Sequence, residues 1–259
     1  WRTDCLPSAR KMGHLAEAIA LDARAERQKA AWQVHLAHSR AAITKMANSI
    51  TRRESVLVLG SGSLHDIPIE HLSGLFKHVY LADIVHLLPA KEASQYFANV
   101  TLLDVDLTSL TDAMVSLPSE LNDALFKQWY TQALTPLNWP AGISYVVSAN
   151  CLSQLPVKPI EWLQKHCTAI SEEALNAFAW QLLHQHVALL RSFQVPVCLI
   201  SDDEQITRNA NGDTVERTAY VQALGLSNEV FARWTWDIAP QGELPQGYTA
   251  QHHVVAIRL

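Results

Sequence analysis

Glycines and acidic residues stand where short apolar runs of this sequence end. The run at 55–59 (SVLVL) is followed by Gly60-Ser61-Gly62-Ser63, and the run at 78–82 (HVYLA) is followed by Asp83. Glycines let a ligand approach the backbone closely, and free amides at the start of a helix bind polar groups. Asp83 comes twenty-one residues after Gly62 and could accept hydrogen bonds from both hydroxyls of a ribose. This spacing predicts a nucleoside-binding site.

Two acids follow the third apolar run, at 100–103, and both are candidates for binding the base of the nucleoside. Asp104 or Asp106 could accept a hydrogen bond from an exocyclic amine, while the backbone amide of Val105 donates to a ring nitrogen. Asp106 is equally suited to cap a helix that begins within LTSL. The predicted cofactor-binding set therefore keeps both acids, and it is completed by Val105, Ile84, Ser148 and Asn150. Asn150 is as well suited to a simple turn as to a contact with cofactor or substrate.

Apolar runs of strand length alternate with segments of helical pattern over most of the chain. Strands are predicted at 55–60, 78–82, 100–103, 143–148 and 195–200. Such alternation with right-handed crossovers builds a parallel sheet that helices cover on both faces. Ligands of these sheets bind outside the carboxyl ends of the strands, which is where the predicted site residues stand.

The two ends of the chain depart from this alternation. Residues 14–50 have a helical pattern and are predicted to form two helices, and 108–140 is predicted to be mostly helical. Residues 233–238 and 248–259 have a strand pattern and flank the turn cluster PQGELPQG, which predicts an antiparallel hairpin. The predicted fold class is therefore α/β: a three-layer Rossmann-like sandwich with a seven-stranded, mostly parallel sheet, a C-terminal hairpin and preceding N-terminal helices.

From about residue 55 to the end, the chain resembles the class I S-adenosylmethionine-dependent methyltransferases. The likeness runs through VLVLGSGSL, VYLAD, LLDVDL, YVVSANCLSQL and the closing hairpin. It implies that the last strand lies antiparallel beside the fifth, and that the cofactor is S-adenosylmethionine. The family's glycine loop and its two acids map onto Gly60 and Gly62, onto Asp83, and onto Asp104 or Asp106. Leu64 stands where family members often carry a third glycine.

A nicotinamide oxidoreductase is the main alternative for a glycine loop followed by an acid. The third glycine of GxGxxG is replaced by His65, and the terminal hairpin is foreign to the usual dinucleotide fold. The segment SANCLSQLP lacks the Asn/Asp-Pro-Pro-aromatic motif of base-modifying methyltransferases and looks like the small-molecule branch. We therefore expect methyl transfer to a small-molecule acceptor by in-line displacement, in which the protein mainly positions the reactants.

No general base is evident in the sequence. His65 and Asp202 are weak candidates, since a base is needed only if the acceptor arrives protonated. Asp202-Asp203-Glu204 is interpreted as a solvated acidic loop after the fifth strand, and Trp234 and Trp236 as core residues on one strand face. His184 and His186 are two apart on a helix and His252 and His253 are adjacent in a strand, so neither pair is expected to bind a metal.

The charge of −5 is divided unevenly along the chain. Residues 1–53 hold ten basic and four acidic residues, whereas 54–259 hold ten basic and twenty-one acidic ones. We interpret 1–53 as a helical cap over the cleft and 54–259 as the Rossmann-like domain. The alternatives are a nucleic-acid methyltransferase that uses the basic helices for phosphate contact, and a cofactor-binding scaffold without catalysis. Nucleic acid is disfavoured because the whole chain is acidic.

The remaining composition bounds the class of protein. The four cysteines form no CxxC pair and no zinc-type spacing, which fits a reducing cytoplasm and predicts no metal. No apolar run approaches the roughly 18 residues needed to cross a bilayer, and the first residues show no signal-peptide pattern. The expected partner is therefore a small-molecule methyl acceptor in the cytoplasm, with no membrane.

Overall fold

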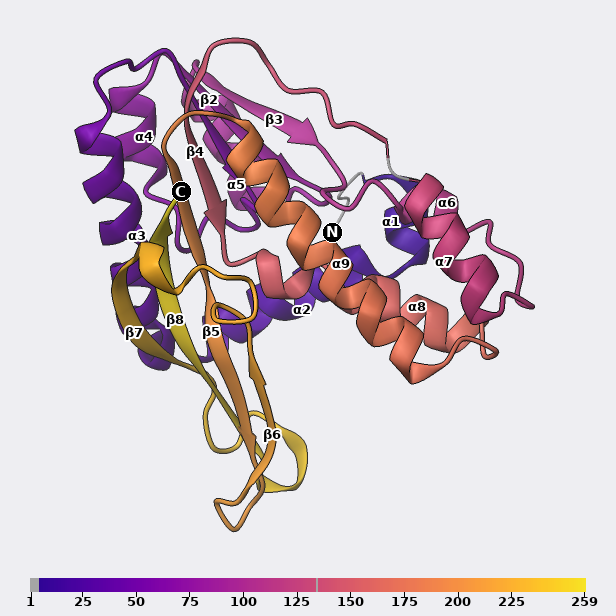
Figure 1. Ribbon diagram of the computed structural model, residues 1–259. Coiled ribbons are helices and arrows are strands. Elements are labelled where there is room, and N and C mark those ends of the chain that lie inside the picture. The colour runs from indigo at the N-terminus through magenta and orange to yellow at the C-terminus, as the bar shows by residue number, and fades with distance from the viewer. Residues whose placement is uncertain (1–4, 134) are drawn as a thin grey trace.

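One mixed sheet organises the protein, whose computed structural model describes residues 5–133 and 135–259 (Figure 1). The strand order is β3-β2-β1-β4-β5-β8-β7, and β6 pairs with β5 off this path. The strands are β1 (Ser55–Leu59), β2 (His78–Asp83), β3 (Val100–Asp104), β4 (Ile143–Ala149), β5 (Val197–Arg208), β6 (Thr214–Ala219), β7 (Val230–Ala239) and β8 (Thr249–Arg258).

Strand direction follows the predicted pattern. The strands β1 to β5 pair in parallel, and β8 is antiparallel to both β5 and β7. The order reverses between β1 and β4, so the loops after these two strands diverge and leave space for a ligand. The Rossmann-like α/β class, the mostly parallel sheet and the antiparallel C-terminal hairpin are confirmed.

The predicted end of the fifth strand is wrong. Strand β5 continues to Arg208 and forms a hairpin with β6, so the sheet has eight described strands rather than seven (Figure 1). Asp202-Asp203-Glu204 lies inside β5 and is not a solvated loop, because each of the three acids has a cross-strand or loop partner. Asp203 pairs with Arg233, Glu204 with Arg217, and Asp202 with His252.

Helices cover both faces of the sheet. The α-helices of the described residues are α1 (Pro7–Lys11), α2 (His14–Arg27), α3 (Lys29–Ser49), α4 (Ile69–Leu75), α5 (Leu88–Tyr96), α6 (Thr111–Met114), α7 (Asp123–Gln132), α8 (Val157–His166) and α9 (Glu172–Ser192). The two helices predicted within 14–50 are confirmed, with a break at Gln28. The segment 108–140 is less helical than predicted, since α6 and α7 are the only α-helices among its described residues (108–133 and 135–140) and its prolines interrupt the pattern.

Alternate residues of β1 belong to two different hydrophobic cores. Val56 and Val58 face a core that includes Ile43 of α3, while Leu57 and Leu59 face a core that includes Leu190 of α9. This period-two pattern places the sheet as the middle of three layers, with α3 and α4 on one face and α9 on the other (Figure 1). The N-terminal helix α3 therefore shares its core with the sheet.

Helix α2 is fastened across the carboxyl edge of the sheet by polar side-chain contacts at three places. Asp22 pairs with His65 beside the glycine loop at 2.9 Å, and Glu17 pairs with Lys158 of α8 at 2.9 Å. Near the end of α2, Arg24 pairs with Glu243 in the loop after β7 at 3.2 Å. These contacts hold α2 as a cover over the strand ends, below the tip of β4 in Figure 1.

Candidate active-site cleft

A cleft of about 330 Å³ lies between the carboxyl ends of the strands and the covering helices α2 and α3. Most of the predicted site residues line it together. They are Gly60, Ser61, Gly62, Ser63, His65, Asp83, Ile84, Val105, Asp106, Asn150 and Asp202. Asp104 and Ser148 do not line the cleft in this structure.

The glycine loop requires glycine at its first position. Gly60 has a φ of 74°, and a β-carbon there would lie 2.6 Å from Cβ of Cys151 and 3.0 Å from the carbonyl oxygen of Ala149. The loop after β4 therefore packs directly on Gly60. Leu64 stands at the position of the family's third glycine. Its backbone is left-handed, with a φ of 61°, which glycine adopts without strain, while its side chain is buried in the core. Burial of the leucine, worth about 1.5–3 kcal/mol, offsets a conformational cost of about 1–2 kcal/mol.

Asp83 joins the glycine loop to the cleft. Its Oδ2 accepts a hydrogen bond of 2.7 Å from the backbone N–H of Gly62, and its Oδ1 accepts one of 3.3 Å from the N–H of Val85. Burial raises the pKa of Asp83, and the backbone hydrogen bond from Gly62 opposes that shift. The two parts of the sequence motif are thus in direct contact, and the carboxylate has a fixed orientation at the cleft wall.

The two acids after β3 have different environments. The Asp104 side chain is 73% exposed and lies 3.6 Å from Nε2 of His86, outside the cleft. The Asp106 side chain accepts hydrogen bonds from the backbone N–H groups of Thr108 (2.8 Å), Leu110 (3.0 Å) and Thr111 (2.8 Å). Asp106 therefore caps the turn before α6 as well as lining the cleft, and of the two acids it alone is placed to reach a bound ligand.

The predicted role of the Val105 amide is not supported. This N–H donates to the carbonyl oxygen of Asp83 at 2.9 Å and continues the pairing of β2 with β3. It is therefore already used within the sheet and is not free for a ring nitrogen. Val105 still lines the cleft.

Ser148 lies at the end of β4 and Asn150 directly after it, and the two have different environments. Ser148 is fully buried, and its Oγ lies 2.8 Å from Nε2 of His186. Asn150 has a φ of 49° and lines the cleft, where its side-chain amide donates to the carboxyl group of Asp66. Burial raises the pKa of Asp66, which favours its protonated form beside Asn150.

Aromatic rings line the cleft where α3 meets β7. The His35 ring stacks on Trp236, with centroids 3.9 Å apart and planes 7° apart, and Trp32 meets Trp236 edge-on at 4.8 Å. Trp234 Nε1 donates to Nδ1 of His35 at 3.0 Å. Burial lowers the pKa of His35 to about 3, so the ring is neutral and, with Nδ1 accepting, carries its proton on Nε2.

Two of these residues carry no sequence signal of a site, and a third is predicted only as a core residue. Trp32 and His35 were not predicted as site residues, although their spacing of three places them on one face of a helix. Trp236 is buried with Trp234, as predicted, but it also lines the cleft. No sequence signal joins α3 to β7, because the contact depends on the tertiary fold.

Asp202 is a buried carboxylate held by three donors. Its Oδ2 accepts from Ser153 Oγ at 2.6 Å and from Gln205 Nε2 at 2.7 Å, and its Oδ1 lies 3.0 Å from Nδ1 of His252. Burial alone would raise the pKa of Asp202, but His252 and the two other partners outweigh burial and lower it. Asp202 is therefore ionised at the cleft and is a poor proton acceptor.

The electrostatic balance of the cleft lining is acidic. Its carboxyl residues are Glu17, Asp22, Asp66, Asp83, Asp106 and Asp202, whereas its lysine and arginine residues are Arg24 and Lys158. Both cations are already paired, Arg24 with Glu243 and Lys158 with Glu17 and Glu161. A positively charged ligand therefore suits the cleft better than a polyphosphate.

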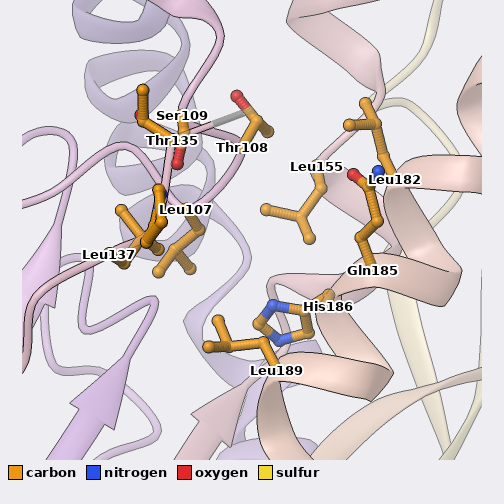
Figure 2. Close-up of a pocket in the computed structure, with 11 residues that line it drawn as sticks. Leu107, Thr108, Ser109, Thr135, Leu137, Leu155, Leu182, Gln185, His186 and Leu189 are labelled. Carbon is orange, nitrogen blue, oxygen red and sulfur yellow. The ribbon is translucent and has the colours of Figure 1, made fainter. Parts of the chain in front are cut away.

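A second cavity of about 190 Å³ adjoins the cleft through Leu107, Thr108 and Leu155. Figure 2 shows Leu107 and Leu137 on one side of it and Leu155 on the other, with His186 below Leu155. Its described lining contains no Asp, Glu, Lys or Arg. This cavity, which has no charged Asp, Glu, Lys or Arg side chain in its described lining, thus adjoins the cleft as an extension of it.

The two histidines of α9 do not share a face of the helix. His184 is exposed and His186 is buried, so the two face different ways from α9. Over residues 5–133 and 135–259, no cluster of three His, Cys, Asp or Glu side chains is suited to a metal ion. In the same residues, no helix is long and apolar enough to cross a membrane.

Comparison with known proteins returns likenesses to solved structures alone. No family model matches the chain, and no curated protein matches it. DhpI in complex with SAH is 15% identical, covers 91% of this chain and 93% of its own, and has a TM-score of 0.40. A Burkholderia thailandensis 1,6-didemethyltoxoflavin-N1-methyltransferase with bound S-adenosylhomocysteine is 10% identical, with coverages of 93% and 89% and a TM-score of 0.39.

An rRNA methylase from Streptococcus thermophilus is 14% identical, with coverages of 86% and 95% and a TM-score of 0.33. Of these similar structures, one is thus a small-molecule methyltransferase and one an rRNA methylase. The Rossmann-like fold rests on the strand order and direction described above, with the antiparallel β8 between β5 and β7.

Proposed function

We propose that this protein is an S-adenosylmethionine-dependent methyltransferase that acts on a small-molecule acceptor. The observation that carries the proposal is the hydrogen bond from Gly62 N–H to Asp83, at the cleft where the strand order reverses. It joins a close-approach backbone loop to a carboxylate suited to ribose hydroxyls. The antiparallel β8 beside β5 is the arrangement that the resemblance to class I methyltransferases implies.

The residues of the cleft fit this cofactor part by part. Asp83 would hold the ribose, and the backbone of Gly60 and Gly62 would face the methionine moiety. Ile84 and Val105 provide apolar contacts for the adenine, with Asp106 at its edge. The acidic lining suits the positive sulfonium, and the paired state of Arg24 and Lys158 leaves no cation in the described lining for a pyrophosphate. This charge pattern favours the sulfonium cofactor over a nicotinamide dinucleotide.

The contribution of the chain to the reaction is positioning and exclusion of water. S-adenosylmethionine supplies an electrophilic methyl group when bound. The glycine loop and Asp83 fix one end of the cleft, and α2 covers it through its pairs with His65 and Lys158. Holding two reactants in line within a closed cleft supplies much of the rate enhancement of such a transfer.

None of the polar side chains described in the cleft is well suited as a strong base. Asp202 is ionised but saturated with donors, and neutral His35 has a lowered pKa. His65 is held by Asp22 and stays the better candidate of the two named from the sequence. The geometry therefore favours an acceptor whose attacking atom has a free lone pair at neutral pH.

Several basic residues within the first 53 positions have partners within the protein. Arg24 and Arg27 pair with Glu243, Arg40 donates to the carbonyl oxygen of His65, and Arg53 donates to that of Ile50. Contacts that fasten the cap account for these charges without a nucleic acid. This favours the small-molecule acceptor over an RNA or DNA acceptor.

Calorimetric titrations with four ligands and one transfer assay test the proposal. Isothermal titration calorimetry of the full chain should detect S-adenosylmethionine and S-adenosylhomocysteine but not NAD or NADP. Incubation with methyl-labelled S-adenosylmethionine and a fractionated cell extract should label the small-molecule fraction. Binding without label in any fraction would support a non-catalytic scaffold, and label in the nucleic-acid fraction would overturn the small-molecule acceptor.

A further inference from the structure

The lining of the cleft changes from carboxylates and backbone groups to aromatic rings near Asn150. Trp32, His35 and Trp236, here called the aromatic wall, all line the cleft and are all nearly buried. The amide nitrogen Nδ2 of Asn150 lies 3.5 Å from Nε2 of His35. The wall therefore begins beside the loop that packs on Gly60, next to the place proposed for the methionine moiety of the cofactor.

The aromatic wall is rigid. Trp32 Nε1 donates to the carbonyl oxygen of Ile238 at 3.1 Å, and Trp234 Nε1 donates to His35 at 3.0 Å. His35 is stacked on Trp236, and His252 meets the same Trp236 ring edge-on at 5.6 Å. These contacts fix the ring planes before any ligand binds. A fixed set of planar rings favours a planar aromatic ligand, because stacking then costs little side-chain entropy.

Two polar atoms on this side of the cleft have no hydrogen-bond partner among the described residues. They are Nε1 of Trp236, whose side chain is more than nine-tenths buried, and Oδ1 of Asn150. An indole N–H can only donate, and an amide oxygen can only accept. Buried polar groups are nearly always paired, so the two atoms indicate an occupant that offers both a lone pair and an N–H or O–H.

The charges at the wall select against an anionic occupant. Asp202 lines the same side of the cleft and is ionised, with its partners Ser153, Gln205 and His252. The lysine and arginine of the cleft lining are both paired, Arg24 with Glu243 and Lys158 with Glu17. A carboxylate or phosphate here would face a like charge without a free counter-ion. A cationic occupant would be repelled by the bound sulfonium.

We propose that the aromatic wall is the acceptor site, and that the acceptor is an uncharged nitrogen heteroaromatic ring. The ring stacks against the wall, accepts a hydrogen bond from Trp236 Nε1 and donates one to Asn150 Oδ1. A further ring nitrogen with a free lone pair attacks the sulfonium methyl, so that the N–C bond forms as the S–C bond breaks. S-adenosylhomocysteine leaves uncharged, and the positive charge passes from sulfur to the methylated ring. This inference rests on the proposed function, since the ligand is an acceptor only if S-adenosylmethionine occupies the rest of the cleft.

Three probes that share the same fused pair of six-membered rings test the chemistry. Isoquinolin-1-one is uncharged and has an N–H beside a carbonyl, naphthalene has no polar edge, and 1-naphthoate is an anion. Calorimetry of the full chain with S-adenosylhomocysteine present should give isoquinolin-1-one a Kd at least tenfold below those of the other two. Tightest binding by 1-naphthoate, or equal binding of all three, overturns the inference.

Matched variants test the contacts. Trp236→Phe keeps an aromatic ring but removes the N–H, and it should weaken isoquinolin-1-one about tenfold while leaving naphthalene unchanged. Trp162→Phe makes the same change on α8, where Nε1 donates to the carbonyl oxygen of Met114, and it should alter neither affinity. Asp202→Asn should strengthen 1-naphthoate several-fold. An equal loss in Trp236→Phe and Trp162→Phe contradicts the inference.

Binding of S-adenosylhomocysteine separates the two proposals and checks the fold of each variant. If S-adenosylhomocysteine binds and isoquinolin-1-one does not, the acceptor inference fails while the proposed function stands. If isoquinolin-1-one binds and neither S-adenosylhomocysteine nor S-adenosylmethionine does, the proposed function fails and the ring is not a methyl acceptor.

Discussion

The two ends of the cleft are built in different ways. At the cofactor end, Gly60, Gly62 and Asp83 come from consecutive strand ends and meet through a backbone hydrogen bond. At the aromatic end, His35 of α3 meets Trp234 and Trp236 of β7, about 200 residues later in the chain. A site made of strand ends is encoded locally, whereas a site made of helix and sheet faces depends on the completed fold. The predictions below test that difference.

The largest effect is expected at the tightest point of the cofactor end. Gly60→Ala places a β-carbon against Cys151 and also strains a φ of 74°, so it should destabilise the fold by about 2–5 kcal/mol and reduce cofactor affinity more than a hundredfold. Gly62→Ala is the matched control, because its β-carbon would have no atom within 4 Å and only the φ of 49° is strained. It should cost about 1–2 kcal/mol in thermal or urea unfolding. Equal losses would show that Cys151 does not constrain the loop.

The next effect concerns the buried histidine of the aromatic end. The pKa of His35 is lowered by burial to about 3, below the 6.5 of an unfolded histidine. Between these values only the unfolded chain binds the proton, so this histidine contributes stability above pH 6.5 that is lost as the pH falls toward 3. Its share of the slope reaches about 1.4 kcal/mol per pH unit.

Urea unfolding from pH 7 to 4.5 measures this slope. His35→Gln should flatten it relative to the wild type, whereas His184→Gln, at an exposed position of α9, should leave it unchanged. If the slopes of wild type and His35→Gln coincide, His35 is not held neutral by burial, and the aromatic wall is more hydrated than described.

The smallest effect is expected at Leu64. Leu64→Gly relieves the left-handed strain but removes a buried side chain, so the net loss of stability should be about 1 kcal/mol. Cofactor affinity should stay within about twofold of the wild type, because the loop already has the conformation of a third glycine. A large gain in affinity on this change would indicate that Leu64 impairs the loop.

The cofactor end of the cleft is more predictable from the sequence than the aromatic end. The strands, the hairpin and the cluster of Gly60, Gly62 and Asp83 are predictable, because apolar runs mark buried strands and their ends meet at one edge. The choice between Asp104 and Asp106 is not, since they lie two residues apart at the end of β3 and only the folded structure shows that Asp106 lines the cleft while Asp104 is exposed outside it. The basic composition of the N-terminal helices is equally ambiguous until their ion pairs are known.

Residues 202–204 show why some structural environments cannot be predicted from a local stretch of sequence. A run of three acids predicts a solvated loop unless partners are known, and the partners come from elsewhere in the chain. Asp202 pairs with His252, fifty residues later, and is buried within β5. Trp32 and His35 were missed for the same reason, because helix α3 has no feature that identifies which strand it covers.

The most direct test of the central claim compares two aspartates at neighbouring strand ends. Asp83 and Asp104 are register partners, yet the first lines the cleft and the second is exposed outside it. By calorimetry with S-adenosylmethionine, Asp83→Asn should lose about 1–3 kcal/mol of binding free energy, while Asp104→Asn should stay within about twofold of the wild type. A folded Asp83→Asn protein with unchanged affinity, or an equal loss in Asp104→Asn, would contradict the placement of the cofactor.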